Sequence, residues 1–70
     1  MPRILLTVRN GDYAITVTET GVFINKGAST WKVNPHAAHY VLFLILNDKV
    51  EDAVRIGLAK SHPLPIPIAS

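Results

Sequence analysis

The chain of 70 residues contains no cysteine. This absence excludes disulfide bonds and thiolate metal sites, and it is compatible with a cytoplasmic location. A domain of this size buries only about 60% of the surface that its unfolded chain exposes, so small domains usually gain stability from a disulfide, a metal or a partner chain. With no disulfide available, we predict that the protein is a homodimer.

The sequence also lacks a long hydrophobic segment. Its longest uninterrupted apolar run is Tyr40 to Leu46, seven residues, whereas a membrane-spanning helix needs about 20. The start, Met1-Pro2-Arg3, lacks the apolar stretch of a signal peptide. The net charge is only +2, which permits an anionic partner without requiring one. We therefore expect a soluble, cytoplasmic protein that has no membrane partner.

No group of residues predicts catalysis or a cofactor. Ser29, Ser61 and Ser70 have no neighbouring His and acid in a recognisable arrangement. The four glycines are scattered, so none forms a phosphate-binding loop. His36 and His39 fall on one side of a helical turn, but a zinc site needs a third or fourth ligand. We expect a protein that is not an enzyme and binds no metal or cofactor.

The segment RILLTVRNGDYAITVTE, residues 3 to 19, predicts a β-hairpin. Asn10-Gly11 is the favoured pair for a two-residue type I′ turn, and this turn sets Val8 opposite Tyr13. One face of the hairpin then carries Ile4, Leu6, Val8, Tyr13, Ile15 and Val17. The other face carries Arg3, Leu5, Thr7, Arg9, Asp12, Ala14, Thr16 and Thr18.

Two further turn signals extend the hairpin into a four-stranded antiparallel β-meander. Turns at Thr20-Gly21 and at Gly27-Ala28 add two strands, the second turn having Gly in the first central position of a type II′ turn. Val17 is then expected opposite Ile24, and Ile24 opposite Trp31. Phe23 and Lys32 fall on the face opposite to the predicted core.

Helical signals follow the meander. Asn34 is a good N-cap residue, and Pro35 suits the first helical position. The segment HAAHYVLFLILN is helical in composition at its start and apolar on every side further on, so the sheet can cover only part of this helix. DKVEDAVRIGLAK is amphipathic, with Asp48 and Glu51 resembling a capping box. The pattern allows one long helix or two short helices broken near Asn47, and we favour the break. The predicted fold class is α+β, with the helices on one sheet face.

The end of the chain predicts an extended Pro-rich arm, residues 63–70, after a single domain over residues 1–62. Pro63, Pro65 and Pro67 alternate with Leu64, Ile66 and Ile68. In β conformation all three missing N–H groups lie on one edge, so such a strand can join a sheet edge and then block further pairing. The arm is expected to cap its own sheet or to reach a partner.

The surplus of apolar surface favours a protein-binding module, such as a small accessory or inhibitory factor that occupies a surface on a larger protein. The predicted contacts, to a second copy or to a protein partner, are Tyr40, Leu42, Phe43, Leu46, Leu64, Ile66 and Ile68.

Single-stranded nucleic-acid binding is the alternative. Basic residues beside an aromatic residue on an open sheet face can follow phosphates and stack a base. The residues of that face would be Arg3, Arg9, Phe23 and Lys32. The segments VRNGDYAITVTE, NKGAS and KVNPHAA resemble the first hairpin, the Lys-Gly segment and the strand-to-helix junction of the positive-cofactor family of transcriptional coactivators. The resemblance implies a homodimer through the helices and single strands on the opposite sheet face. This chain departs from the family in a less basic sheet and a more apolar helix.

Overall fold

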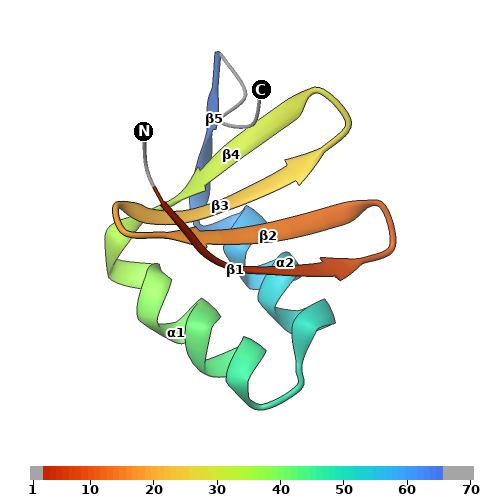
Figure 1. The fold of residues 1–70 in the computed structure, drawn as a ribbon, viewed down its shortest axis with the longest axis vertical. Coiled ribbons are helices and arrows are strands. Elements are labelled where there is room, and N and C mark those ends of the chain that lie inside the picture. Colours follow the sequence, from red (N-terminus) through yellow and green to blue (C-terminus); the bar gives the residue numbers. More distant parts are fainter. Residues whose placement is uncertain (1–2, 66–70) are drawn as a thin grey trace.

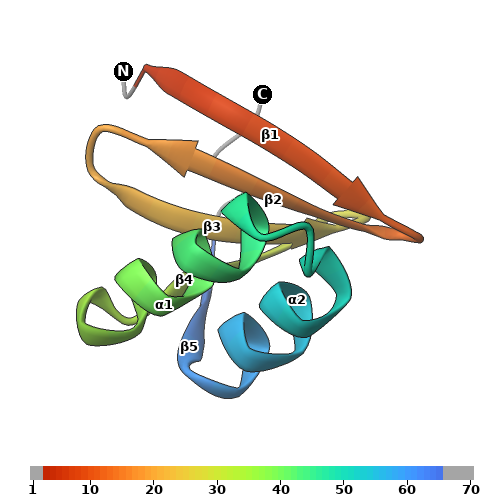
Figure 2. The same ribbon diagram turned by 90° about the horizontal axis from the view of Figure 1, so that it is seen from below.

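The computed structural model describes residues 3–65 and shows a five-stranded antiparallel sheet with two helices (Figure 1). The elements in chain order are β1 (Ile4–Asn10), β2 (Tyr13–Thr18), β3 (Gly21–Lys26), β4 (Ser29–Val33), α1 (Pro35–Leu46), α2 (Val50–Ala59) and β5 (Ser61–Leu64). The strands lie in sequence order, and both helices cover the same face of the sheet (Figure 2). The predicted α+β meander is confirmed, and the structure adds a fifth strand.

The first two turns lie one residue away from their predicted positions. Asn10 pairs with Tyr13, so the first loop is Gly11-Asp12. Gly11 has φ 59°. It occupies the first central position of the turn, the position that needs a positive φ here. The second loop is Glu19-Thr20, and Val17 therefore faces Val22.

Both pairings are shifted by two residues, and a shift of two leaves every side chain on its predicted face. The third turn, Gly27-Ala28, and the pairing of Ile24 with Trp31 are confirmed.

A β-bulge at Leu5 changes the start of β1. Ile4 pairs with Thr18 and Leu6 pairs with Val17, so Leu5 is the additional residue between them. One extra residue reverses the alternation, and Ile4 therefore lies on the outer face, away from the helices. The predicted place of Ile4 on the core face was wrong for this reason.

Two hydrogen bonds end α1 and separate it from α2. The Lys49 N–H donates to the Leu44 carbonyl at 2.8 Å, and the Asp48 N–H donates to the Ile45 carbonyl at 3.1 Å. Asp48 has φ 59°. This is a Schellman motif with Asp in the left-handed position that usually holds glycine. The favoured break is confirmed.

The N-cap of α1 falls at the expected residue, Asn34, whereas the N-cap of α2 does not fall at Asp48. Asn34 precedes α1, but its side chain makes no capping hydrogen bond, and its Oδ1 lies 3.3 Å from Nδ1 of His62 in β5. Lys49 occupies the N-cap position of α2, and no side chain caps that helix. The predicted capping box of Asp48 with Glu51 was therefore wrong, because Asp48 belongs to the C-terminal turn of α1.

β5 pairs with β4 in the same sheet, Thr30 opposite Leu64 and Trp31 opposite Pro63. The strand crosses the predicted boundary between residues 62 and 63. Of the two expectations for the arm, capping of its own sheet is the one observed for Ser61–Leu64. Ile66 and Ile68 lie outside the described residues.

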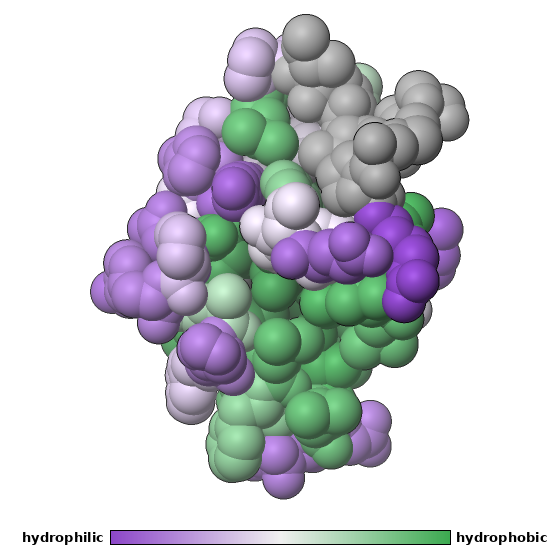
Figure 3. All heavy atoms as spheres, turned by 60° about the vertical axis from the view of Figure 1, so that its left-hand side comes forward, coloured by the Kyte–Doolittle hydropathy of each residue, from purple (hydrophilic) through white to green (hydrophobic). Residues whose placement is uncertain are grey.

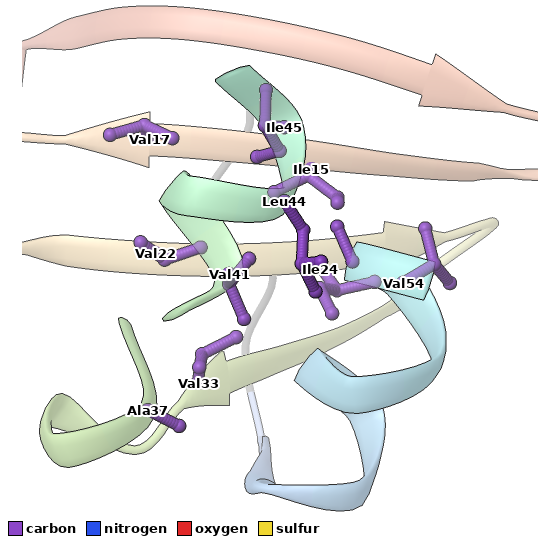
Figure 4. Close-up of a cluster of buried hydrophobic side chains, with 11 residues drawn as sticks. Ile15, Val17, Val22, Ile24, Val33, Ala37, Val41, Leu44, Ile45 and Val54 are labelled. Atoms are coloured by element: carbon purple, nitrogen blue, oxygen red, sulfur yellow. The ribbon is translucent and has the colours of Figure 1, made fainter. Parts of the chain in front are cut away.

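The core lies between the sheet and the two helices (Figure 4). The sheet contributes alternate residues of its inner face, and α1 contributes the side formed by Val41, Leu44 and Ile45. The buried cluster consists of Ile15, Val17, Val22, Ile24, Val33, Ala37, Val41, Leu44, Ile45, Ala53 and Val54. Because the same helix is apolar all round, burial of this side leaves apolar residues on the other.

Candidate functional site

The side of α1 that points away from the core is apolar and exposed. Its large hydrophobic side chains follow one another at intervals of three residues. Tyr40 is 52% exposed, Phe43 56% and Leu46 80%. From Pro35 to Leu46 the helix contains no Asp, Glu, Lys or Arg, and its remaining exposed polar residues are His36 and His39. A surface helix normally places charged residues on this side.

The second helix provides an internal comparison. α2 covers the same sheet face, but its outward side carries Glu51 and Arg55. Nη2 of Arg55 lies 3.0 Å from Oδ1 of Asp52. The two helices thus differ in what they present to solvent, although both pack on the same core. The uncharged surface is a property of α1 and not of the helical layer as a whole.

Tyr40 and Phe43 form a stacked aromatic pair, with ring centroids 6.3 Å apart and planes 13° apart. Stacking restricts both side chains before any partner arrives. Less conformational entropy is then lost when a partner covers the rings. Aromatic residues are enriched at protein–protein contacts because a rigid ring offers a large contact area.

The N-terminal half of β1 carries further exposed apolar residues. Leu5 is 53% exposed and Leu6 38%, and Leu6 shares the helix-facing side of the sheet with Val17. Figure 3 shows hydrophobic side chains gathered into one broad region on the face of the molecule formed by α1 and the start of β1. We call the set Leu5, Leu6, Tyr40, Phe43 and Leu46 the apolar surface.

The structure brings together only part of the predicted protein contact. Tyr40, Phe43 and Leu46 are neighbours on α1. Leu42 is half-buried and packs against the core cluster. Leu64 lies on β5 opposite Thr30, a residue of the outer sheet face.

Sequence reasoning missed Leu5 and Leu6 as contact residues. The sequence feature that could have indicated them is a pair of adjacent leucines in an otherwise alternating strand. Such a pair interrupts the period of two that a regular strand requires.

The residues of the nucleic-acid alternative are dispersed. Nε of Arg3 lies 3.4 Å from Oε1 of Glu19, so this cation is already paired. Phe23 is 6% exposed, and Nζ of Lys32 lies 5.9 Å from the centre of its ring. Arg9 is on β1 and Lys32 is on β4, and these strands are three strand spacings, or about 14 Å, apart across the sheet. The ring is therefore not presented for stacking, and the cations do not form one patch.

Among residues 3–65, two shallow clefts lie beside residues of the predicted nucleic-acid face. One, of about 280 Å³, lies between the start of α1 and the β2–β3 turn, with Glu19, Lys32 and His39 among its lining residues. The other, of about 340 Å³, lies on the outer sheet face beside Arg9 and Asp12.

Within residues 3–65, no three His, Asp or Glu side chains gather as a metal site would require. Neither helix of this region has the length and apolar character needed to cross a membrane.

Comparisons of the chain with protein-family models, with curated proteins and with solved structures each gave no match. The resemblance to the positive-cofactor family therefore rests on short segments of sequence alone. The function has to be inferred from the surface of the molecule, and the apolar surface is its most distinctive feature.

Proposed function

We propose that this protein is a small non-enzymatic protein-binding module, a homodimeric accessory or inhibitory factor that acts by occupying a surface on a larger protein. The observation that carries the proposal is the exposed, uncharged side of α1, where Tyr40 stacks on Phe43 and Leu46 is 80% exposed. The charged outward side of α2 supports it, because the same fold could have placed charges on α1 as well.

The energetics of the apolar surface favour a partner. Burial of apolar area contributes about 25 cal/mol per Å², and contiguous exposed patches larger than a few hundred Å² mark interaction sites in soluble proteins. A partner that covers the aromatic pair and Leu46 removes from water side chains that are exposed in the described part of the chain. The proposal includes a cytoplasmic location, which the cysteine-free composition permits.

The test compares one lysine on each helix. Phe43→Lys places a charge in the middle of the apolar surface, whereas Ala59→Lys places the same charge at an exposed position of α2. Wild type and both variants are used for affinity capture from an extract of the native host, and captured proteins are quantified. We expect the specific partner with wild type and with Ala59→Lys, and its loss with Phe43→Lys. Equal capture by all three chains would refute the proposed surface.

A further inference from the structure

We infer that α1 binds the α1 of a second copy of this chain, in antiparallel orientation, about a two-fold axis that passes close to Phe43. The inference rests on the proposed function, because it assigns the apolar side of α1 to the homodimer that the proposed function includes. A two-fold axis requires a surface that is complementary to itself. The residues of α1 meet this requirement.

The spacing along α1 is symmetric about Phe43. Tyr40 precedes Phe43 by three residues, and Leu46 follows it by three. At 100° per residue, these two side chains lie about 60° to either side of Phe43 on the helix surface. In an antiparallel pair centred on Phe43, each Tyr40 therefore faces the second copy's Leu46, and the two Phe43 rings face each other.

The polar residues at the ends of α1 favour the antiparallel orientation, because an imidazole N–H can donate a hydrogen bond to a carboxylate. His36 and His39 lie on the exposed side near the start of the helix, and Asp48 follows its end. Asp48 lies five residues after Phe43, and the two histidines lie four and seven residues before it. Antiparallel packing thus brings each Asp48 close to the second copy's histidines. Parallel packing would instead place the two Asp48 carboxylates side by side.

The area available fits a contact between two copies. Aromatic side chains bury about 150–250 Å² each, so the partly exposed apolar surface offers on the order of 500 Å². His36, His39 and Asn47 border it on α1. With this polar rim the contact approaches the roughly 800 Å² per partner of a standard interface. A second copy also supplies the additional stabilisation that a cysteine-free domain of 70 residues lacks.

The absence of native cysteine allows a direct test by cross-linking. The single-cysteine chains are Tyr40→Cys, Leu46→Cys and, as a control on α2, Ala59→Cys. Each chain alone, and a mixture of the first two, is treated with a short bis-maleimide at tens of micromolar protein. We expect several-fold more cross-linked dimer in the mixture of Tyr40→Cys with Leu46→Cys than in either chain alone. Ala59→Cys should give only background.

Light scattering on untagged protein completes the test. We expect wild type to have the mass of two chains at tens of micromolar, and Phe43→Lys to weaken the dimer by about tenfold or more while its circular dichroism spectrum is unchanged. A monomeric wild type would overturn the inference. Tyr40→Cys cross-linking to itself better than to Leu46→Cys would overturn the antiparallel arrangement.

The failure of this inference can be told apart from failure of the proposed function. If wild type is a monomer but Phe43→Lys still loses a captured protein, binding of a second copy is refuted and binding of another protein is not. If neither the mass nor the capture depends on Phe43, both are refuted.

Discussion

Gly57 of α2 lies so close to Ile24 of β3 that a methyl group in place of its hydrogen would sit 2.6 Å from Cδ1 of Ile24. Carbon atoms in good contact are about 3.5–4.0 Å apart. Ile24 is 0% exposed, and Val33 and Val41 lie within 4 Å of the same point. The missing side chain of Gly57 therefore allows α2 to approach the sheet.

Gly57→Ala is expected to lower the free energy of unfolding by about 1 kcal/mol. Overpacking a core lowers the free energy of unfolding by about 1–3 kcal/mol. The higher helix propensity of alanine raises it by about 1 kcal/mol and so offsets part of this loss. Ile24→Val removes the methyl group that would clash. In that background Gly57→Ala should be neutral or stabilising. Urea unfolding of the four proteins measures the coupling, and strictly additive effects would contradict the proposed contact.

Asp48→Gly should stabilise each chain by about 0.5–1 kcal/mol. Glycine adopts a positive φ without a steric penalty, and the change also removes an acid from the negative end of the α1 dipole. Asp48→Val should destabilise the chain, because a β-branched residue is strained at φ 59°. Thermal unfolding of both variants tests this. If the second copy binds as inferred, Asp48→Gly should at the same time weaken the dimer, which light scattering would show.

Removal of β5 should destabilise the sheet and change the environment of Trp31, the only tryptophan. Trp31 faces Pro63 across β4 and β5, and its ring lies 6.4 Å from that of Tyr13. A chain that ends at Lys60 should show a red-shifted tryptophan emission and a lower unfolding midpoint. A chain that ends at Pro65 retains β5 and serves as the control. Identical spectra and midpoints for the two chains would show that β5 contributes little.

Single-stranded DNA or RNA is expected to bind weakly or not at all. Phe23 is buried, Arg3 is paired with Glu19, and Arg9 is about three strands away from Lys32. Fluorescence anisotropy with labelled oligonucleotides at low and physiological salt measures this. Micromolar binding that falls steeply with salt and is lost on changing Arg9 and Lys32 to Glu would favour the nucleic-acid alternative instead.

Local sequence was sufficient for most of the sheet and for the helix boundaries. Alternation with a period of two assigned Ile15, Val17, Val22 and Ile24 to the core face, and this assignment survived a two-residue error in two registers. Turn residues located the three loops to within one position, and Asn34-Pro35 marked the start of α1. These features depend on neighbouring residues, whose conformational preferences are local.

The sequence named Tyr40, Phe43 and Leu46 among the contact residues, but only the tertiary structure decided which side of α1 is exposed. Because α1 is apolar on every side, no periodicity in its sequence distinguishes the side that packs from the side that remains exposed. Packing against the sheet and α2 buries Val41, Leu44 and Ile45, and it leaves Tyr40, Phe43 and Leu46 in solvent. The bulge at Leu5 and the pairing of β5 with β4 are likewise contacts between distant segments. Their positions depend on the shape and the hydrogen-bonding edge of the assembled sheet, which no short stretch of the chain encodes.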